Sequence, residues 1–218
     1  MLSTEYFIFV DLYNPLTRHN LEHTRQILST AYYAATSEHL FAEQYLSGQA
    51  NYLPYLINDQ RSTGFLSFYC NSATASYRVD YDAEITRLRH FPTLPSRLSC
   101  IYAFATQEDC IKANRLYGWD LKTVRRFTLL QDPLTRIMKV NMEIISLMRS
   151  AYSLTMWSPE YIENIWIHYW SGKGNLDIEV PTLQAPPNSH QRVSSGEIWE
   201  YLIEGRLHLQ GDLYTPIF

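Results

Sequence analysis

A stretch near the middle of the chain, Leu98–Ala105, is apolar on both faces of the strand that it predicts. Successive side chains of a strand point to opposite sides of its sheet, so a strand of this kind needs a packed layer on each side. Thr106 then caps a predicted helix, with Asp109 at the capping-box position and Gly118 at the helix end. The two faces of the predicted strand are Leu98, Cys100, Tyr102 and Phe104, and Ile101, Ala103 and Ala105.

Apolar spacing and turn residues predict the remaining elements. In the first half we expect a strand over residues 5–13, a helix starting at Asn20, a second helix from Ser37 to Gly48, and a strand within "GFLSFYCNSATASY". In the second half the predicted elements are a strand over 121–132, an alternating strand over 138–144, a helix from Ser158 to Gly172, a Pro-rich connection over 180–196, and two β segments meeting at Glu204-Gly205.

Length and element order define the expected fold. A chain of 218 residues can bury a substantial core and favours one large domain over two small ones. Strands that alternate with helices, without any internal repeat, predict an α+β protein. We therefore expect a single domain over 1–218, with a helical insertion at about 20–90.

Composition limits the environment and the partners. The net charge of −4 and the pI of about 6.0 disfavour broad attraction to nucleic acid or an anionic membrane, although a local basic groove remains open. The N-terminus lacks the pattern of a signal peptide, and no run resembles a membrane span. Cys70, Cys100 and Cys110 are too few and too irregular for a disulfide framework or a zinc site. These features predict a cytoplasmic protein without a membrane partner.

Common catalytic motifs are absent. The sequence contains no HExxH, no Gly-rich phosphate loop, no GxSxG and no CxxC, so metal, hydrolase and kinase chemistries lose their usual support. His19 and His23 are spaced by one helical turn, but Glu22 lies on another face, and we interpret the pair as a solvated helix end.

Two sites remain as candidates for chemistry. Arg97, next to Ser96, stands at the entrance of the apolar strand, where a guanidinium suits a pyrophosphate or carboxylate and the hydroxyl suits a ribose. The structural alternative for Arg97 is an ion pair with an acid such as Glu84. Glu200 shares a predicted strand face with apolar residues, where a carboxylate needs a partner or a function. Its alternative is a register that turns it to solvent.

The segment "RHFPTLPSRLSCIYAFATQEDCIKA" resembles part of the DUF2441-type proteins encoded by phages and bacteria, which are similar to the ADP-ribosyltransferase superfamily. "IWEYLIEGRLHLQG" resembles the last motif of that superfamily, and "IHYWSGKG" is similar to an element between the two. The resemblance covers roughly residues 84–210. It implies an ADP-ribosyltransferase-like mixed β-sheet core with flanking helices.

The resemblance also implies a reaction and its residues. NAD would be the substrate, Glu200 would stabilise an oxocarbenium-like ribose, Arg97 would hold the pyrophosphate, and Ser96 would orient the ribose. Tyr102, or a tyrosine from the early helices, would stack on the nicotinamide, and the alternative for Tyr102 is a place in the core. Members of the superfamily carry a His or Arg in the first strand, whereas this strand reads "YFIFVDLYN". The residues that would replace it, just beyond the strand, are Arg18 and His19.

These expectations give one leading function and two alternatives. The leading one is an NAD-dependent mono-ADP-ribosyltransferase acting on a macromolecular acceptor, a host protein in preference to a nucleic acid, in the host cytoplasm if the chain is phage-encoded. The first alternative is a non-enzymatic interaction protein that inhibits a host complex through an aromatic-rich surface. The second is a nucleic-acid glycosylase that uses Glu200, which the acidic net charge disfavours.

Overall fold

The computed structural model describes residues 4–53, 68–152, 154–155, 157–182 and 189–218. The chain forms two compact units, one built from residues 1–50, 93–139 and 198–218 and the other from 51–92 and 140–197. Helices and antiparallel sheets occur together in the described residues, so the predicted α+β class is confirmed. The single domain with a helical insertion stays a prediction.

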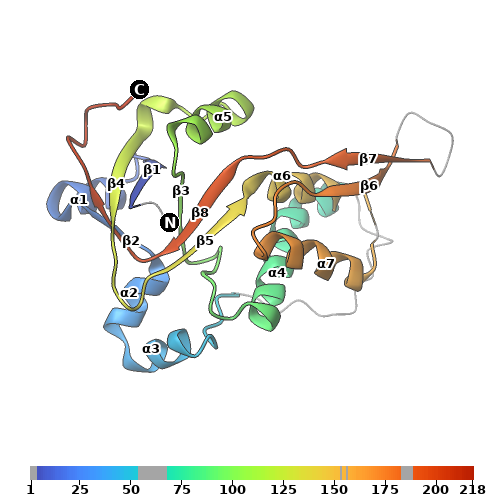
Figure 1. Ribbon diagram of the computed structural model, residues 1–218, viewed down its shortest axis with the longest axis horizontal. Coiled ribbons are helices and arrows are strands. Elements are labelled where there is room, and N and C mark those ends of the chain that lie inside the picture. Colours follow the sequence, from blue (N-terminus) through green and yellow to red (C-terminus); the bar gives the residue numbers. More distant parts are fainter. Residues whose placement is uncertain (1–3, 54–67, 153, 156, 183–188) are drawn as a thin grey trace. The chain divides into compact units, whose positions relative to one another are not determined.

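A four-stranded antiparallel sheet lies in the first unit, with the strand order β1-β4-β9-β2 (Figure 1). One face of this sheet is apolar and forms a continuous core with residues of neighbouring elements. The strands are β1 (Glu5–Phe9), β4 (Val124–Leu130), β9 (Arg206–Leu209) and β2 (Gln26–Leu28). The core includes Tyr6, Ile8, Leu21, Ile101, Phe127, Ile203, Leu207 and Leu209.

A three-stranded sheet has the order β3-β8-β5, formed by β3 (Ile101–Ala103), β8 (Trp199–Glu204) and β5 (Arg136–Asn141). The chain passes from β8 to β9 through Gly205, whose N–H donates to the Ser29 hydroxyl at 3.0 Å. A Cβ at Gly205 would lie 3.2 Å from Cγ2 of Thr135, which is closer than ordinary contact. The predicted meeting of two β segments at Glu204-Gly205 is confirmed.

Three helices among the described residues of the first unit begin at side-chain caps. Asn14 caps α1 (Pro15–Thr24), Ser29 caps α2 (Thr30–Ser37), and Thr106 caps α5 (Gln107–Tyr117). The helix α3 (His39–Leu46) and the 3₁₀ turn Leu121–Thr123 complete the unit. The helix expected to start at Asn20 is wrong, because α1 begins at Pro15 and ends at Thr24, and Arg25 then adopts a left-handed conformation with φ of 56° before β2.

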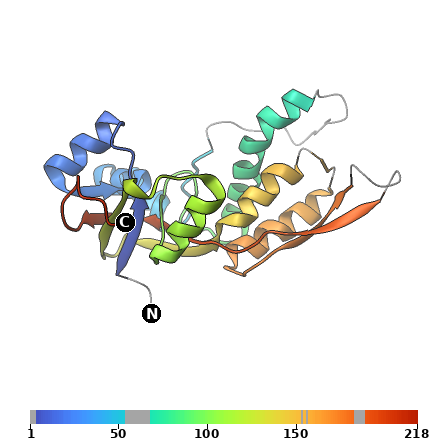
Figure 2. The same cartoon turned by 90° about the horizontal axis from the view of Figure 1, so that it is seen from above.

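The described residues of the second unit form three helices and a β-hairpin. The long helix α4 (Phe68–His90) packs against both α6 (Met142–Ala151) and α7 (Pro159–Trp170) (Figure 2). The hairpin pairs β6 (Asp177–Pro181) with β7 (His190–Ser194). Buried polar bonds tie the helices together, since the Tyr152 hydroxyl donates to Asp82 at 2.8 Å and the Trp170 indole donates to the Ala83 carbonyl at 2.7 Å.

Several predicted elements differ from the structure. The strand expected within "GFLSFYCNSATASY" is wrong from Phe68 onward, where α4 begins, and residues 64–67 lie outside the described residues. The Pro-rich connection expected over 180–196 includes the end of β6 and all of β7, which pair as a hairpin. The strand expected over 138–144 ends at Asn141, whose side chain caps α6. The strand expected to be buried on both faces is short, and Leu98 and Tyr102 are exposed.

Candidate functional site

Strand β8 carries two carboxylates on one face. Glu200 and Glu204 are four residues apart, so both point to the same side as Leu202, while Tyr201 and Ile203 face the apolar core of the first unit. Glu200 is 6% exposed and Glu204 is fully buried. Burying an ionised carboxylate costs several kcal/mol unless other groups compensate its charge, so each side chain requires polar neighbours.

Arg97 supplies a partner for Glu200. Its Nη1 donates to Oε1 of Glu200 at 3.1 Å, and the guanidinium is itself buried. The same guanidinium lies over the Tyr102 ring, 5.2 Å from its centroid, and the Tyr102 hydroxyl donates to the Arg97 carbonyl at 2.6 Å. Tyr102 remains 40% exposed. A buried ion pair therefore adjoins an aromatic ring that reaches solvent.

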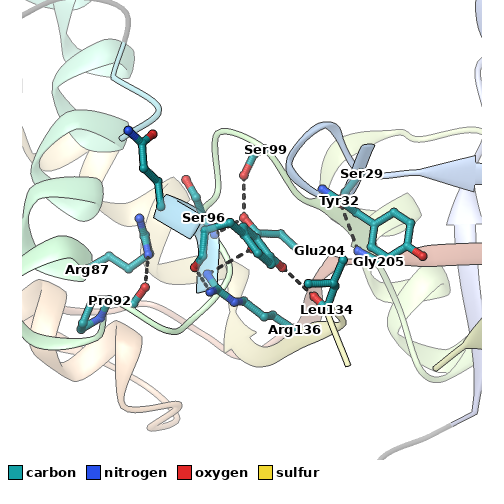
Figure 3. A network of polar contacts seen from close by, with 12 residues as sticks. Ser29, Tyr32, Arg87, Pro92, Ser96, Ser99, Leu134, Arg136, Glu204 and Gly205 are labelled. Atoms are coloured by element: carbon teal, nitrogen blue, oxygen red, sulfur yellow. Dashed lines mark hydrogen bonds and ion pairs between the residues drawn. The ribbon is translucent and has the colours of Figure 1, made fainter. Parts of the chain in front are cut away.

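Glu204 anchors the turn that carries Arg97. One carboxylate oxygen accepts hydrogen bonds from the Ser96 N–H at 2.9 Å and from the Ser99 hydroxyl at 2.6 Å, as Figure 3 shows for Ser99. The other oxygen lies 3.9 Å from Nη1 of Arg136. Arg136 in turn lies over the Tyr45 ring at 3.7 Å and donates to the Tyr45 carbonyl. These bonds fix the 96–99 turn against β8.

The Ser96 side chain faces the inside of the turn. Its hydroxyl accepts the Leu98 N–H at 3.1 Å, and the residue is fully buried. The neighbouring Cys100 thiol donates to the Arg97 carbonyl, and burial raises the pKa of this thiol well above its usual range. Because the thiolate is the reactive form, Cys100 is poorly suited to act as a nucleophile.

The structure brings most of the predicted site residues together. Ser96 and Arg97 lie on the 96–99 turn, Tyr102 lies on β3, and Glu200 lies on the neighbouring strand β8. Hydrogen bonds link Arg97 to both Glu200 and Tyr102. Glu200 is buried, so the alternative register that turns it to solvent is wrong. The alternative partner for Arg97, Glu84, instead accepts two hydrogen bonds from Arg87 in the second unit.

The residues proposed to replace the missing first-strand cation do not join this group. Arg18 and His19 lie on the exposed surface of α1, and the His19 ring contacts the His23 ring at a centroid distance of 4.1 Å. In the described part of the chain, no hydrogen bond or ion pair links them to Arg97 or Glu200. Their role in binding stays a prediction.

Sequence reasoning missed the groups that hold the turn in place. Glu204 was named only as the end of a strand, although its spacing from Glu200 puts both carboxylates on one face. That spacing was a usable signal. Arg136, Ser99 and Tyr45 have no such signal, because each reaches Glu204 or Arg136 through contacts between distant parts of the chain.

The fold and the site define an α+β protein with a buried Arg–Glu pair beside an exposed tyrosine ring. Residues 6–183 match the family described as "Protein of unknown function (DUF2441)", so the chain belongs to the DUF2441 family, as predicted. Ser96, Arg97 and Tyr102 lie inside the matched segment, and Glu200 lies beyond it. No curated protein matches this sequence.

The described residues show neither a metal-binding cluster nor a membrane-spanning helix. Across the described ranges, no group of three or more His, Cys, Asp or Glu side chains is placed to hold a metal ion. In the same ranges, no helix has both the length and the apolar character needed to cross a lipid bilayer.

Proposed function

We propose that this chain is an NAD-dependent mono-ADP-ribosyltransferase that modifies a protein acceptor. The observation that supports the proposal is the contact between Arg97 and Glu200, at 3.1 Å, beside the exposed ring of Tyr102. These residue types suit the three parts of NAD that the reaction must hold, namely its pyrophosphate, its ribose and its nicotinamide ring.

Each residue has a distinct role in this proposal. The planar guanidinium of Arg97 matches the oxygens of a pyrophosphate. The carboxylate of Glu200 accepts the ribose 2′-hydroxyl and stabilises positive charge on the anomeric carbon. Tyr102 offers a ring face for the nicotinamide. Ser96 keeps the Arg97 turn in place through its bond to Leu98, and Glu204 positions the same turn.

The proposed reaction is a substitution at one carbon. The bond between the anomeric carbon and the nicotinamide nitrogen breaks, and the bonding electrons leave with neutral nicotinamide. A nucleophilic atom of the acceptor forms a new bond to the same carbon and gives up its proton to a base or to water. The transition state carries oxocarbenium character, which a nearby carboxylate stabilises, as in glycoside hydrolysis.

Nicotinamide release and label transfer from NAD test the proposal, with a cell extract as the source of acceptors. We expect Glu200→Gln to lower the rate by about 10²–10³-fold, the usual effect of removing one preorganised group. Glu160→Gln, which changes an exposed acid of α7, serves as the matched control and should retain the full rate. Equal rates for Glu200→Gln and the unmodified chain would remove Glu200 from the mechanism.

NAD binding needs a separate measurement, because the first strand lacks a His or Arg and has the fully buried Tyr6 near its start. A ligand that binds only the folded state raises the melting temperature by mass action. We expect NAD to raise the melting temperature of the unmodified chain, and Arg97→Met to remove that increase. An unchanged melting temperature at saturating NAD argues against the transferase.

A second candidate function is a non-enzymatic interaction protein, which an exposed aromatic cluster on the first unit favours. Trp119 is 40% exposed and its ring lies 5.4 Å from that of Tyr117, beside Leu116, which is 62% exposed. Aromatic side chains of this kind are common anchors of protein interfaces. Biological activity that persists in an Arg97→Ala, Glu200→Gln double variant and disappears in Trp119→Ser would support this function over the transferase.

A further inference from the structure

A pocket of about 560 Å³ opens between the start of α7 and the β6–β7 hairpin, entirely within the second unit. We name it the α7–hairpin pocket. Its volume falls within the range of small-ligand sites. It is lined by Trp157, Tyr161, Asp177, Ile178, Glu179, His190 and Arg192.

One wall of the α7–hairpin pocket is aromatic. The rings of Trp157 and Tyr161 lie 5.3 Å apart at an interplanar angle of 55°, so they form a corner instead of a parallel stack. Tyr161 is 38% exposed, which leaves part of its ring in contact with solvent. The faces of tryptophan and tyrosine rings attract cations, and tryptophan does so most strongly.

The opposite wall is the charged face of the hairpin. Asp177 and Glu179 alternate with the buried Ile178 along β6, and Glu179 lies directly opposite Arg192 of β7. Nη2 of Arg192 donates to Oδ2 of Asp177 at 2.6 Å, and this bond helps to keep the pKa of Asp177 below its usual value. Two carboxylates face one guanidinium, so the wall carries an excess of one negative charge.

These two walls suit a planar cation more than an anion or an apolar group. A phosphate would approach Glu179 against charge repulsion, and the guanidinium of Arg192 already binds Asp177. An arginine side chain can stack on the rings and offer donors to Glu179 at the same time. We propose that the α7–hairpin pocket binds an arginine side chain of a protein partner, over Trp157 and Tyr161 and paired with Glu179.

The proposal stands independently of NAD cleavage, and its test contains no NAD. The full-length chain is labelled with ¹⁵N, and the indole N–H signal of Trp157 is assigned by its loss in Trp157→Phe. N-acetylarginine amide is then titrated, with N-acetylcitrulline amide as the neutral probe of nearly equal shape. We expect a saturable shift with the arginine compound and a much smaller one with the citrulline compound.

Two variants of the hairpin should change the affinity for N-acetylarginine amide in opposite directions. Glu179→Gln should weaken binding by about threefold or more, and Arg192→Gln should tighten it by a similar factor because it releases Asp177 from its internal partner. Glu160→Gln, outside the pocket lining, should change nothing. A general loss of structure cannot produce opposite signs in neighbouring residues.

Four results would overturn the proposal. These are equal shifts from the arginine and citrulline compounds, unaltered affinity in Glu179→Gln, weaker binding in Arg192→Gln, and stronger binding of N-acetylphosphoserine amide than of the arginine compound. An absence of any shift of the Trp157 signal with the arginine compound would count against it equally. None of these five outcomes bears on nicotinamide release, so failure here is distinguishable from failure of the transferase.

Discussion

Arg97 and Glu200, which are 103 positions apart in the sequence, form a buried ion pair in which the guanidinium donates to the carboxylate at 3.1 Å. The pair lies at the junction of the 96–99 turn and β8. Both charges are removed from water, so removing one of them leaves the other in an apolar environment with poorer compensation.

We predict that Arg97→Met and Glu200→Gln are energetically coupled. Arg97→Met alone should lower the free energy of unfolding by about 3–5 kcal/mol, the usual cost of breaking a buried pair from one side. The double variant should be less destabilised than the sum of the single variants, because no uncompensated charge remains. Urea unfolding of the four proteins measures the coupling, and strictly additive losses would show that the contact has little energetic weight.

Glu204 should contribute more to stability than its hydrogen-bond partners taken singly. Ser99→Ala removes one hydroxyl and should cost about 1 kcal/mol, whereas Glu204→Ala removes the acceptor of both the Ser99 hydroxyl and the Ser96 N–H and should cost about 3 kcal/mol or more. Amide exchange at Ser96 should accelerate in Glu204→Ala. Slow exchange at Ser96 in that variant would mean that another group holds the turn.

The parts of the fold that the sequence predicts best are those with local causes. The boundaries of α5 follow from Thr106, Asp109 and Gly118, and the start of α7 follows from Ser158, all within a few residues of the helix ends. The expected helix from Asn20 fails because Arg25 adopts a left-handed conformation. Non-glycine residues seldom do so, and no sequence signal marked this one.

The missed elements have non-local causes. In the β6–β7 hairpin, β7 is mostly exposed and lacks the apolar alternation that predicts a strand, and β6 alternates over only five residues and ends at Pro181. At the site, the cost of burying Glu200 indicated that it needs a partner or a function, but the acid that the sequence suggested as a structural partner of Arg97 was Glu84, which instead binds Arg87. The involvement of Arg136 and Tyr45 depends on tertiary contacts, which spacing along the sequence cannot indicate.

Tyr6 should lower the stability of the fold in alkaline solution. Burial, with a smaller contribution from Tyr201, raises the pKa of Tyr6 to about 12 from the value of 10.0. The unfolded chain therefore loses this proton first, so the stabilising effect is complete below about pH 10 and is lost as the pH rises to about 12. Between these two pH values we expect the ionisation of Tyr6 to lower the free energy of unfolding by about 1–2 kcal/mol.

Tyr6→Phe tests this alkaline effect. The Tyr6 hydroxyl has no hydrogen-bond partner among the described residues, so the substitution should leave the stability at neutral pH nearly unchanged or slightly improved. Its free energy of unfolding should decline less steeply with pH than that of the unmodified chain. Identical pH profiles for the two proteins would show that the hydroxyl reaches water or another acceptor.

The thiols of Cys100 and Cys110 should resist modification in the folded protein. Burial raises the pKa of Cys110 to about 12 and that of Cys100 further, so almost no thiolate forms near pH 8. In a Cys70→Ser background, a thiol reagent should react with these two residues only at the rate of unfolding. Rapid labelling without denaturant would indicate that the turn after Arg97 or the start of α5 opens readily.

Gly118 and Gly205 should both resist replacement, for different physical reasons. Gly118 ends α5 with φ of +70°, and no atom lies within 4 Å of a Cβ built there, so Gly118→Ala should cost about 1 kcal/mol through backbone strain alone. Gly118→Asn should cost less, because asparagine tolerates this conformation.

At Gly205 the obstacle to a side chain is Cγ2 of Thr135. Thr135→Ser should therefore rescue the unfolding midpoint of Gly205→Ala and leave that of Gly118→Ala unchanged, and rescue of both would refute the distinction.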